Sequence, residues 1–190
     1  MRIAFFVPAS SRHAKPQIGA FRLLLLAAVS AIGLSAAPQT ASAARSVVSF
    51  SPEVEPGTIV ISANKRRLFL VVDRGVAYSY PVAVPKHGKE WSGTTSVGGK
   101  YVNPDWVPPP VVKADHPELP NFIPGGSPRN PMGVRALTLG YGDVAIHGTT
   151  HKMRASIGTA ASYGCIRMLN EDVSDLYERV DVGAPVIMSH

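Results

Sequence analysis

The chain contains a single cysteine, Cys165, among its 190 residues. One thiol cannot form an internal disulfide, so a folded monomer must be stabilised by apolar packing and backbone hydrogen bonds. Cys165 is therefore a small buried residue, half of an intermolecular bridge, or a nucleophile. About 147 residues follow the leader described below, which is long enough for one domain with its own core.

Residues 1–43 have the pattern of a signal peptide. They hold four Lys or Arg and no acidic residue, the 15 residues from 23 to 37 are uncharged, and Ala41-Ser42-Ala43 offers a small-x-small cleavage site. A bilayer-spanning helix needs about 20 apolar residues. We therefore expect a cleaved leader and an exported protein with no stable membrane span, with an uncleaved anchor as the alternative.

The charge of the mature chain is small. The full chain has 19 Lys and Arg against 13 Asp and Glu, and the leader holds four of the cations, which leaves 15 against 13, or +2. Proteins that bind nucleic acid concentrate basic residues in patches. The only basic run after the leader is Lys65-Arg66-Arg67, at the start of a strand-like segment, so we expect no nucleic-acid partner.

The pattern after residue 57 predicts a mainly β domain over residues 58–190, preceded by a leader segment over 44–57. One helix is expected over about 170–180, with Asn170 as its N-cap. The Pro- and Gly-rich residues 85–133 predict a long ordered loop or lid. Strands are predicted, from β-branched or apolar runs, at 58–62, 67–72, 76–84, 136–139, 143–147 and 186–188, and another is expected to enter Cys165.

His147 lies eighteen residues before Cys165 and is the candidate partner of the thiol. An imidazole beside a thiol can accept its proton and so produce the nucleophilic thiolate. The spacing suits a strand end, an excursion through residues 148–161 and a return to the same rim. Gly164 allows a tight turn, and the backbone N–H groups of Tyr163, Gly164 and Cys165 are candidate donors to an oxyanion.

Other kinds of site are weakly supported. His147 and His151 have a spacing that binds metal on a helix, but Gly148-Thr149-Thr150 between them is a poor helix and no third ligand is evident. The pairs Gly98-Gly99 and Gly125-Gly126 lack the Lys-Ser/Thr of a phosphate loop. We expect neither a metal nor another cofactor.

Three motifs together resemble the L,D-transpeptidase catalytic domains of the YkuD type. They are NPMGVRAL at residues 130–137, IHGT at 146–149 and SYGCIRMLNED at 162–172. The resemblance covers residues 58–188 and implies a β-sandwich-like fold with the nucleophile at its rim. Many members have His where this chain has Tyr163, which cannot act as a base near neutral pH.

The resemblance also implies a reaction on peptidoglycan stem peptides. Cys165 would attack the carbonyl of the third stem residue and release D-Ala, while His147 moves the proton. The acceptor amine would come from another stem, a free D-amino acid or a lysine of an envelope protein. Ser162 would support the turn, Gly148 and Thr149 would support or bind at the site, and Arg167 would meet a substrate carboxylate or form a structural ion pair. An exported cysteine L,D-carboxypeptidase and a non-catalytic wall-binding module are the alternatives.

Overall fold

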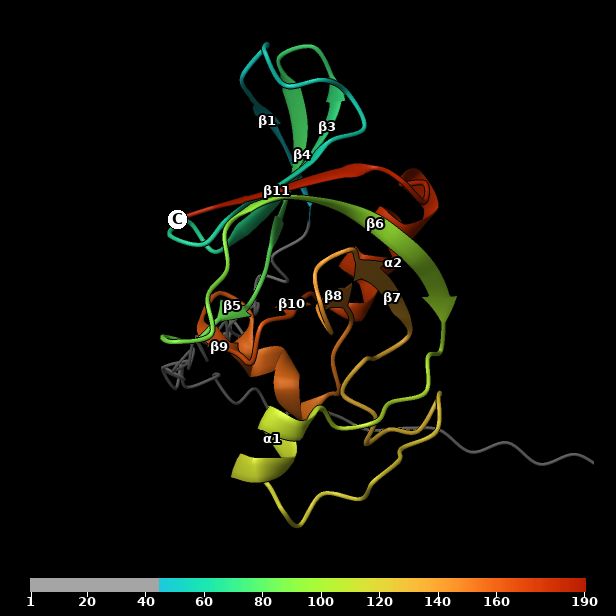
Figure 1. The fold of residues 1–190 in the computed structure, drawn as a ribbon. Helices are drawn as coiled ribbons and strands as arrows, with labels where there is room; N and C mark the ends of the chain where they lie inside the picture. The colour runs from blue at the N-terminus through green and yellow to red at the C-terminus, as the bar shows by residue number, and fades with distance from the viewer. Residues whose placement is uncertain (1–44) are drawn as a thin grey trace, which may run out of the picture. The chain divides into compact units, whose positions relative to one another are not determined.

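The computed structural model describes residues 45–190, so the expected signal peptide lies outside the described part. Eleven strands and one helix of ten residues confirm the predicted mainly β fold (Figure 1). No helix within residues 45–190 is long and apolar enough to cross a membrane. The strands are β1 Ser46–Ser49, β2 Ile59–Ser62, β3 Arg67–Asp73, β4 Val76–Pro81, β5 Val84–Pro85, β6 Gly93–Val102, β7 Arg135–Leu139, β8 Ala145–His147, β9 Ala160–Ser162, β10 Ile166–Arg167 and β11 Pro185–Ser189. The helices are α1 Pro110–Asp115, the 3-10 turn η1 Lys152–Ser156 and α2 Asn170–Arg179.

Nine strands form one sheet in the order β1-β4-β3-β2-β11-β6-β7-β8-β10, and β5 pairs with β9 beside it. The long strand β6 joins two groups of strands, because residues 93–96 pair with β11 and residues 97–102 pair with β7. A register shift between Val97 and Gly99 marks a bulge, and bulges bend the strand that carries them. Figure 1 shows β6 curving over the β7–β8–β10 group, which carries the candidate site.

The core lies between these two groups of strands and α2. Strand β2 buries alternate residues, Ile59 and Ile61, and α2 buries Val173 and Leu176 on one face. Full burial of such side chains stabilises a fold by about 1.5–3 kcal/mol each. This packing replaces the disulfides that a chain with one cysteine cannot form.

Two segments differ from the sequence-based expectation. Residues 85–133, expected to form a long ordered loop or lid, contain the ten-residue strand β6 and the short helix α1, so the loop is limited to the residues outside these two elements. Residues 44–57, expected to lead onto the fold, contribute β1, which pairs with β4 at one edge of the sheet. In β6 only Val97 is buried, so the strand lacks the apolar alternation from which strands are recognised.

Asn170 was predicted to be the N-cap of α2, but it is not. The helix begins at Asn170 itself, after Leu169, and no side-chain bond caps it. The Asn170 Oδ1 atom instead accepts a hydrogen bond of 3.0 Å from the backbone N–H of Thr149, at the end of β8. A methyl group on Gly133 or Gly148 would overlap this same oxygen. Glycine at 148 is thus required for close packing against Asn170.

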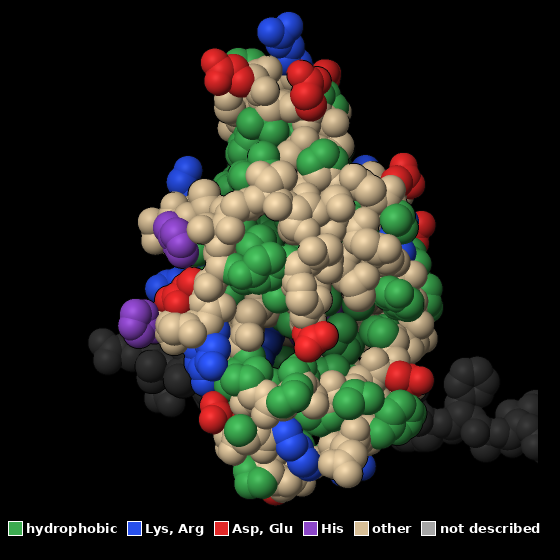
Figure 2. Space-filling view, viewed as in Figure 1, with side chains coloured by type: hydrophobic (Ala, Val, Ile, Leu, Met, Phe, Trp, Pro, Cys, Tyr) green, Lys and Arg blue, Asp and Glu red, His purple; other side chains and the backbone are tan. Residues whose placement is uncertain are grey.

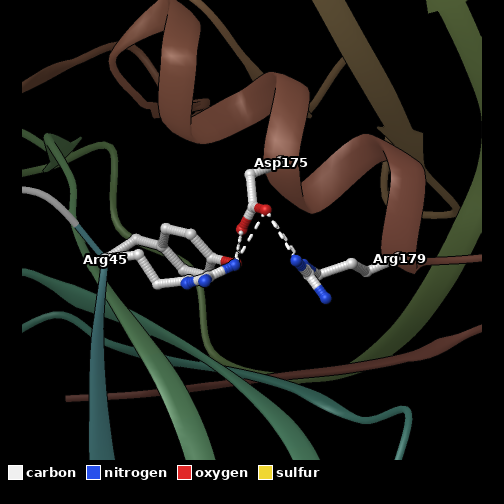
Figure 3. A network of polar contacts seen from close by, with 4 residues as sticks. Arg45, Asp175 and Arg179 are labelled. Carbon is white, nitrogen blue, oxygen red and sulfur yellow. Dashed lines mark hydrogen bonds and ion pairs between the residues drawn. The ribbon is translucent and has the colours of Figure 1, made fainter.

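A polar network around Asp175 of α2 ties the first described residue to the helix (Figure 3). Arg45 donates to both carboxylate oxygens at 2.9 Å, and Arg179 donates at 3.0 Å. The hydroxyl of the fully buried Tyr80 donates at 2.6 Å. Burial alone would raise the pKa of Asp175, but the hydrogen bonds from Arg179, Tyr80 and Arg45 outweigh it and lower the pKa to about 2.

Replacing Asp175 with alanine is expected to lower the free energy of unfolding by about 2 kcal/mol at pH 7, because the Tyr80 hydroxyl loses its acceptor. For a domain of this size that corresponds to a fall of about 4–8 °C in Tm. Thermal unfolding followed by circular dichroism measures it. The matched control is the same substitution in a Tyr80→Phe background, which has no hydroxyl to lose its acceptor. There Asp175→Ala should lower the free energy of unfolding by less than it does in the wild type.

The same network predicts a pH dependence. A carboxyl whose folded pKa is depressed contributes stability above its ordinary pKa and loses it as pH falls through the folded pKa. The Tm difference between the wild type and Asp175→Ala should therefore narrow between about pH 4 and pH 2. A difference that stays constant over this range would contradict the assigned role of Asp175.

Candidate active site

The parallel strands β8 and β10 bring His147, Arg167 and Cys165 onto one face of the sheet. Ile146 pairs with Ile166, and His147 pairs with Arg167. Successive side chains of a strand point to opposite faces. Because Ile146 and Ile166 point into the core, His147, Arg167 and the preceding Cys165 face the other way, and all three line one cleft.

The cleft has a volume of about 970 Å³ and a mostly apolar lining. Figure 2 shows apolar side chains gathered around a hollow in the lower half of the molecule, beside the segment that carries α1. Five basic or imidazole side chains besides His147 line the cleft, whereas Asp143 is its one acidic residue among those described. The apolar residues of its far wall include Trp106, Pro109, Pro110, Val111, Val112 and Ile123.

His147 is buried, with 4% of its surface exposed, and its Nδ1 lies 2.8 Å from the carbonyl oxygen of Gly148. A carbonyl only accepts, so Nδ1 carries the proton in this contact, and Nε2 is the nitrogen left to act as a base. Burial, and then the positive charge of Arg167, lower the pKa of His147 to about 4, although the backbone carbonyls of Gly148 and Pro131 both favour the protonated ring and oppose the effect of burial. The imidazole is therefore neutral at pH 7 and available as a base.

The thiol of Cys165 is also neutral at rest. Its Sγ lies 3.8 Å from the carbonyl oxygen of Asp143, and the side chain is partly exposed. Burial raises the pKa of Cys165, while the backbone N–H of Ala145 and the charge of Arg167 act in the opposite direction. The two pKa shifts, down for His147 and up for Cys165, favour a neutral thiol and imidazole over an ion pair.

The turn that carries Cys165 is held by polar contacts on both sides. Gly164 has a φ of +135°, which a side chain would strain. Ser162 donates its hydroxyl to the carbonyl oxygen of Cys165 and accepts from the N–H of Gly164 at 3.3 Å. These two hydrogen bonds of Ser162 lie within the turn and hold it closed.

These contacts distinguish the candidate oxyanion donors that are already engaged within the protein from those that are free. The N–H of Gly164 is directed to Ser162, so it is engaged inside the turn and does not fit the predicted role. Within residues 45–190, the N–H groups of Tyr163 and Cys165 donate to no other group of the protein. They are the donors left to meet a developing negative charge.

Trp91, which the sequence did not indicate, fixes the orientation of the nucleophile's own amide. Its Nε1 donates to the carbonyl oxygen of Gly164 at 2.9 Å, and its ring stacks on Tyr141 with 5.3 Å between centroids. The Gly164 carbonyl and the Cys165 N–H belong to one planar trans peptide, so they point in opposite directions. Holding the carbonyl against Trp91 turns the Cys165 N–H away from it.

Arg167 has no carboxylate within 4.0 Å of its guanidinium in the described part of the chain. The alternative of a structural ion pair therefore has no support, and the guanidinium in the cleft is available to a ligand. Thr149 has a different position: its buried hydroxyl donates to the carbonyl of Met168 at 3.2 Å. It supports the end of β8 and does not line the cleft.

His147 and His151 do not share a helix, because His147 ends β8 and His151 precedes η1. Residues 45–190 contain no group of three or more His, Cys, Asp or Glu that could hold a metal ion. The Gly98-Gly99 pair lies at the bulge of β6, where it bends a strand.

Comparison with known proteins identifies the family of the chain and its relatives. The family model of the L,D-transpeptidase catalytic domain, YkuD, matches residues 56–188. The probable L,D-transpeptidase YbiS of Escherichia coli (strain K12) is 34% identical over 139 residues, which cover 70% of this chain and 44% of that protein. The chain therefore matches less than half the length of this relative.

Two solved structures are also similar. An L,D-transpeptidase from Mycobacterium smegmatis has a TM-score of 0.56 at 21% identity and covers 70% of this chain and 58% of its own. A Brucella melitensis protein described as a probable carnitine operon oxidoreductase is 40% identical, with a TM-score of 0.50 over 74% of this chain and 89% of its own.

Proposed function

Because the chain belongs to the L,D-transpeptidase catalytic-domain family, we propose that it is a periplasmic enzyme that transfers peptidoglycan stem peptides through a thioacyl intermediate on Cys165. The main support is that Cys165, His147 and Arg167 share one sheet face and line one cleft. Oxidoreductase chemistry, which the name of the Brucella relative refers to, has no comparable support from these three groups.

The first step is acylation. His147 Nε2 takes the thiol proton as the sulfur attacks the carbonyl of the third stem residue, and a C–S bond forms. Neutral starting groups fit this role, since a base is needed only at the moment of attack. The N–H groups of Tyr163 and Cys165 stabilise the oxyanion, and a single such donor typically contributes about 10²–10³ in rate.

The intermediate then collapses and the C–N bond to D-Ala breaks. The proton held by His147 moves to the departing amine, which leaves as free D-Ala. In the second step an acceptor amine attacks the thioester, gives a proton to His147, and the C–S bond breaks. That proton returns to the sulfur, so the enzyme is restored without net gain or loss.

Arg167 is the proposed contact for a carboxylate of the donor stem. A guanidinium binds a carboxylate through two parallel hydrogen bonds, and the Arg167 side chain is free of protein carboxylates within residues 45–190. Its charge beside the imidazole also keeps His147 neutral by lowering the pKa.

Incubation of the mature protein with tetrapeptide muropeptides, followed by mass spectrometry, tests the proposal. A joined product that has lost one D-Ala is the expected result, either from two stems or from one stem and an added D-amino acid. Loss of D-Ala with addition of water alone would identify a carboxypeptidase. Unchanged muropeptides, together with no carbapenem adduct on Cys165, would indicate a wall-binding module.

The contact between Trp91 and Gly164 predicts a catalytic effect away from the cleft. Trp91→Phe keeps an aromatic ring beside Tyr141 but removes the donor to the Gly164 carbonyl. Loss of one hydrogen bond to a positioned peptide should lower the acylation rate by about tenfold. Stopped-flow acylation by a carbapenem measures this rate. Tyr141→Phe, which retains the stacked ring, is the control, and equal rates in the two variants would contradict the role of the indole N–H.

A further inference from the structure

The hydroxyl of Tyr163 is engaged outside the reacting groups. It donates to Asp115 Oδ2 at 2.7 Å, at the end of α1. The ammonium of Lys86 lies 3.7 Å from the centre of the Tyr163 ring and 3.6 Å from the same carboxylate oxygen. These three side chains, here called the Tyr163 bridge, join three segments that are far apart in the sequence.

The Tyr163 bridge connects the two sides of the cleft. Tyr163 is two residues before the nucleophile, and the N–H of Lys86 donates to the carbonyl oxygen of Ser162 at 2.9 Å, so both belong to the nucleophile side. Asp115 ends α1, whose residues Pro110 to Val112 line the opposite wall. Asp115 and Lys86 do not line the cleft themselves.

Few side-chain contacts besides the bridge hold α1 in place. His116, directly after the helix, packs the edge of its ring against Tyr163 with 6.2 Å between centroids. The helix has six residues and none of them is buried, and a helix this short has little stability of its own. The side chain of Lys113 bonds to the carbonyl of Leu119 in the same segment. Across the described residues, the Tyr163 bridge supplies the only side-chain hydrogen bond and ion pair that link α1 to another segment.

At neutral pH Asp115 is negatively charged and Lys86 is positively charged, so the bridge is intact. The hydrogen bond from Tyr163, followed by the charge of Lys86, lowers the pKa of Asp115. The contact with Tyr163, followed by the negative charge of Asp115, raises the pKa of Lys86. Asp115 is exposed, and Lys86 and Tyr163 are only half-buried, so the tether is weak and reversible. Its loss should therefore widen the cleft without unfolding the domain.

We propose that the Tyr163 bridge determines specificity by holding α1 at a fixed distance from the nucleophile turn. It thereby sets the width of the cleft at Cys165 and slows the reaction of bulky acyl donors relative to slender ones. The nature of the donors rests on the proposed function, whereas the effect on access to the thiol does not.

The single cysteine of the chain makes the proposal testable without catalysis. Rates of Cys165 alkylation by iodoacetamide, a small reagent, and by fluorescein maleimide, a bulky one, are measured by intact mass. In Asp115→Ala and Tyr163→Phe the ratio of the bulky rate to the small rate should rise by about threefold, a size consistent with loss of an exposed tether. Circular dichroism establishes that each variant is folded.

Glu118→Gln is the matched control, because it removes a carboxylate from the same segment but no group of the bridge. Its ion-pair partner among the described residues is His116 at 3.4 Å, whose ring edge packs on Tyr163 and stays in place in this variant. An unchanged ratio in both bridge variants, or an equal rise in Glu118→Gln, would overturn the proposal. In turnover, the bridge variants should lower KM for a cross-linked dimer donor relative to the tetrapeptide monomer. If the wild type transfers no peptide, the alkylation ratios still decide the role of the bridge.

Discussion

Replacing Cys165 with alanine should abolish both peptide transfer and carbapenem acylation, with a fall in kcat of at least about 10⁴-fold. The chain has no second thiol. The hydroxyl of Ser162, three residues away, donates to the carbonyl oxygen of Cys165 and is held in the turn. Mass spectrometry of muropeptide products and of the intact protein measures the two losses.

The control for Cys165→Ala is a measurement of its Tm, which establishes that the variant is folded. Cys165 is only partly buried, so Tm should change by no more than about 3 °C, which corresponds to about 1 kcal/mol. Retained D-Ala release by a correctly folded Cys165→Ala protein would show that another group is the nucleophile.

His147→Gln should lower the acylation rate by about 10³-fold at pH 7, because the thiol then loses its proton without a positioned base. Glutamine keeps a polar side chain in a buried position but has no group that accepts a proton near neutral pH. Single-turnover acylation by a carbapenem measures the step directly. A rate within a few-fold of the wild type would mean that the base has been misassigned.

The pH dependence of the same step gives a second criterion. Burial and the charge of Arg167 lower the pKa of His147 to about 4, so the basic form is present above that pH. The wild-type rate should rise through an acid limb near pH 4, with apparent pKa values that belong to the coupled pair. In His147→Gln this limb should disappear, and the rate should rise toward the raised pKa of the thiol. An acid limb that persists in the variant would belong to another group.

Much of the site was predictable because it depends on side-chain chemistry at recognisable spacings. The motifs around His147 and Cys165 indicated a thiol and an imidazole at one rim. In the structure His147 ends β8, and Cys165 lies directly before the neighbouring strand β10. The roles of these residues in a reaction stay predictions until the variants are measured. A helix was also predicted over about 170–180, from the apolar spacing of Val173, Leu176, Tyr177 and Val180, and α2 spans Asn170–Arg179.

The features that the sequence did not indicate depend on backbone groups or on contacts between distant segments. The carbonyl of Gly148 orients the imidazole, and every residue type carries such a group. Trp91 meets Gly164 across 73 positions, and Tyr163 meets Asp115 across 48, distances over which no local pattern extends. Strand β6 was missed because most of its side chains are not buried.

The sharing of β6 between both groups of strands has a consequence for how the domain unfolds. Neither group can lose its pairing with β6 without exposing the common core, which draws residues from both. A domain of this size with one continuous core is expected to melt in a single cooperative transition. The calorimetric and van't Hoff enthalpies should then agree. A substitution in the Asp175 network would lower the unfolding temperature of the distant cleft by the same amount as that of the whole domain.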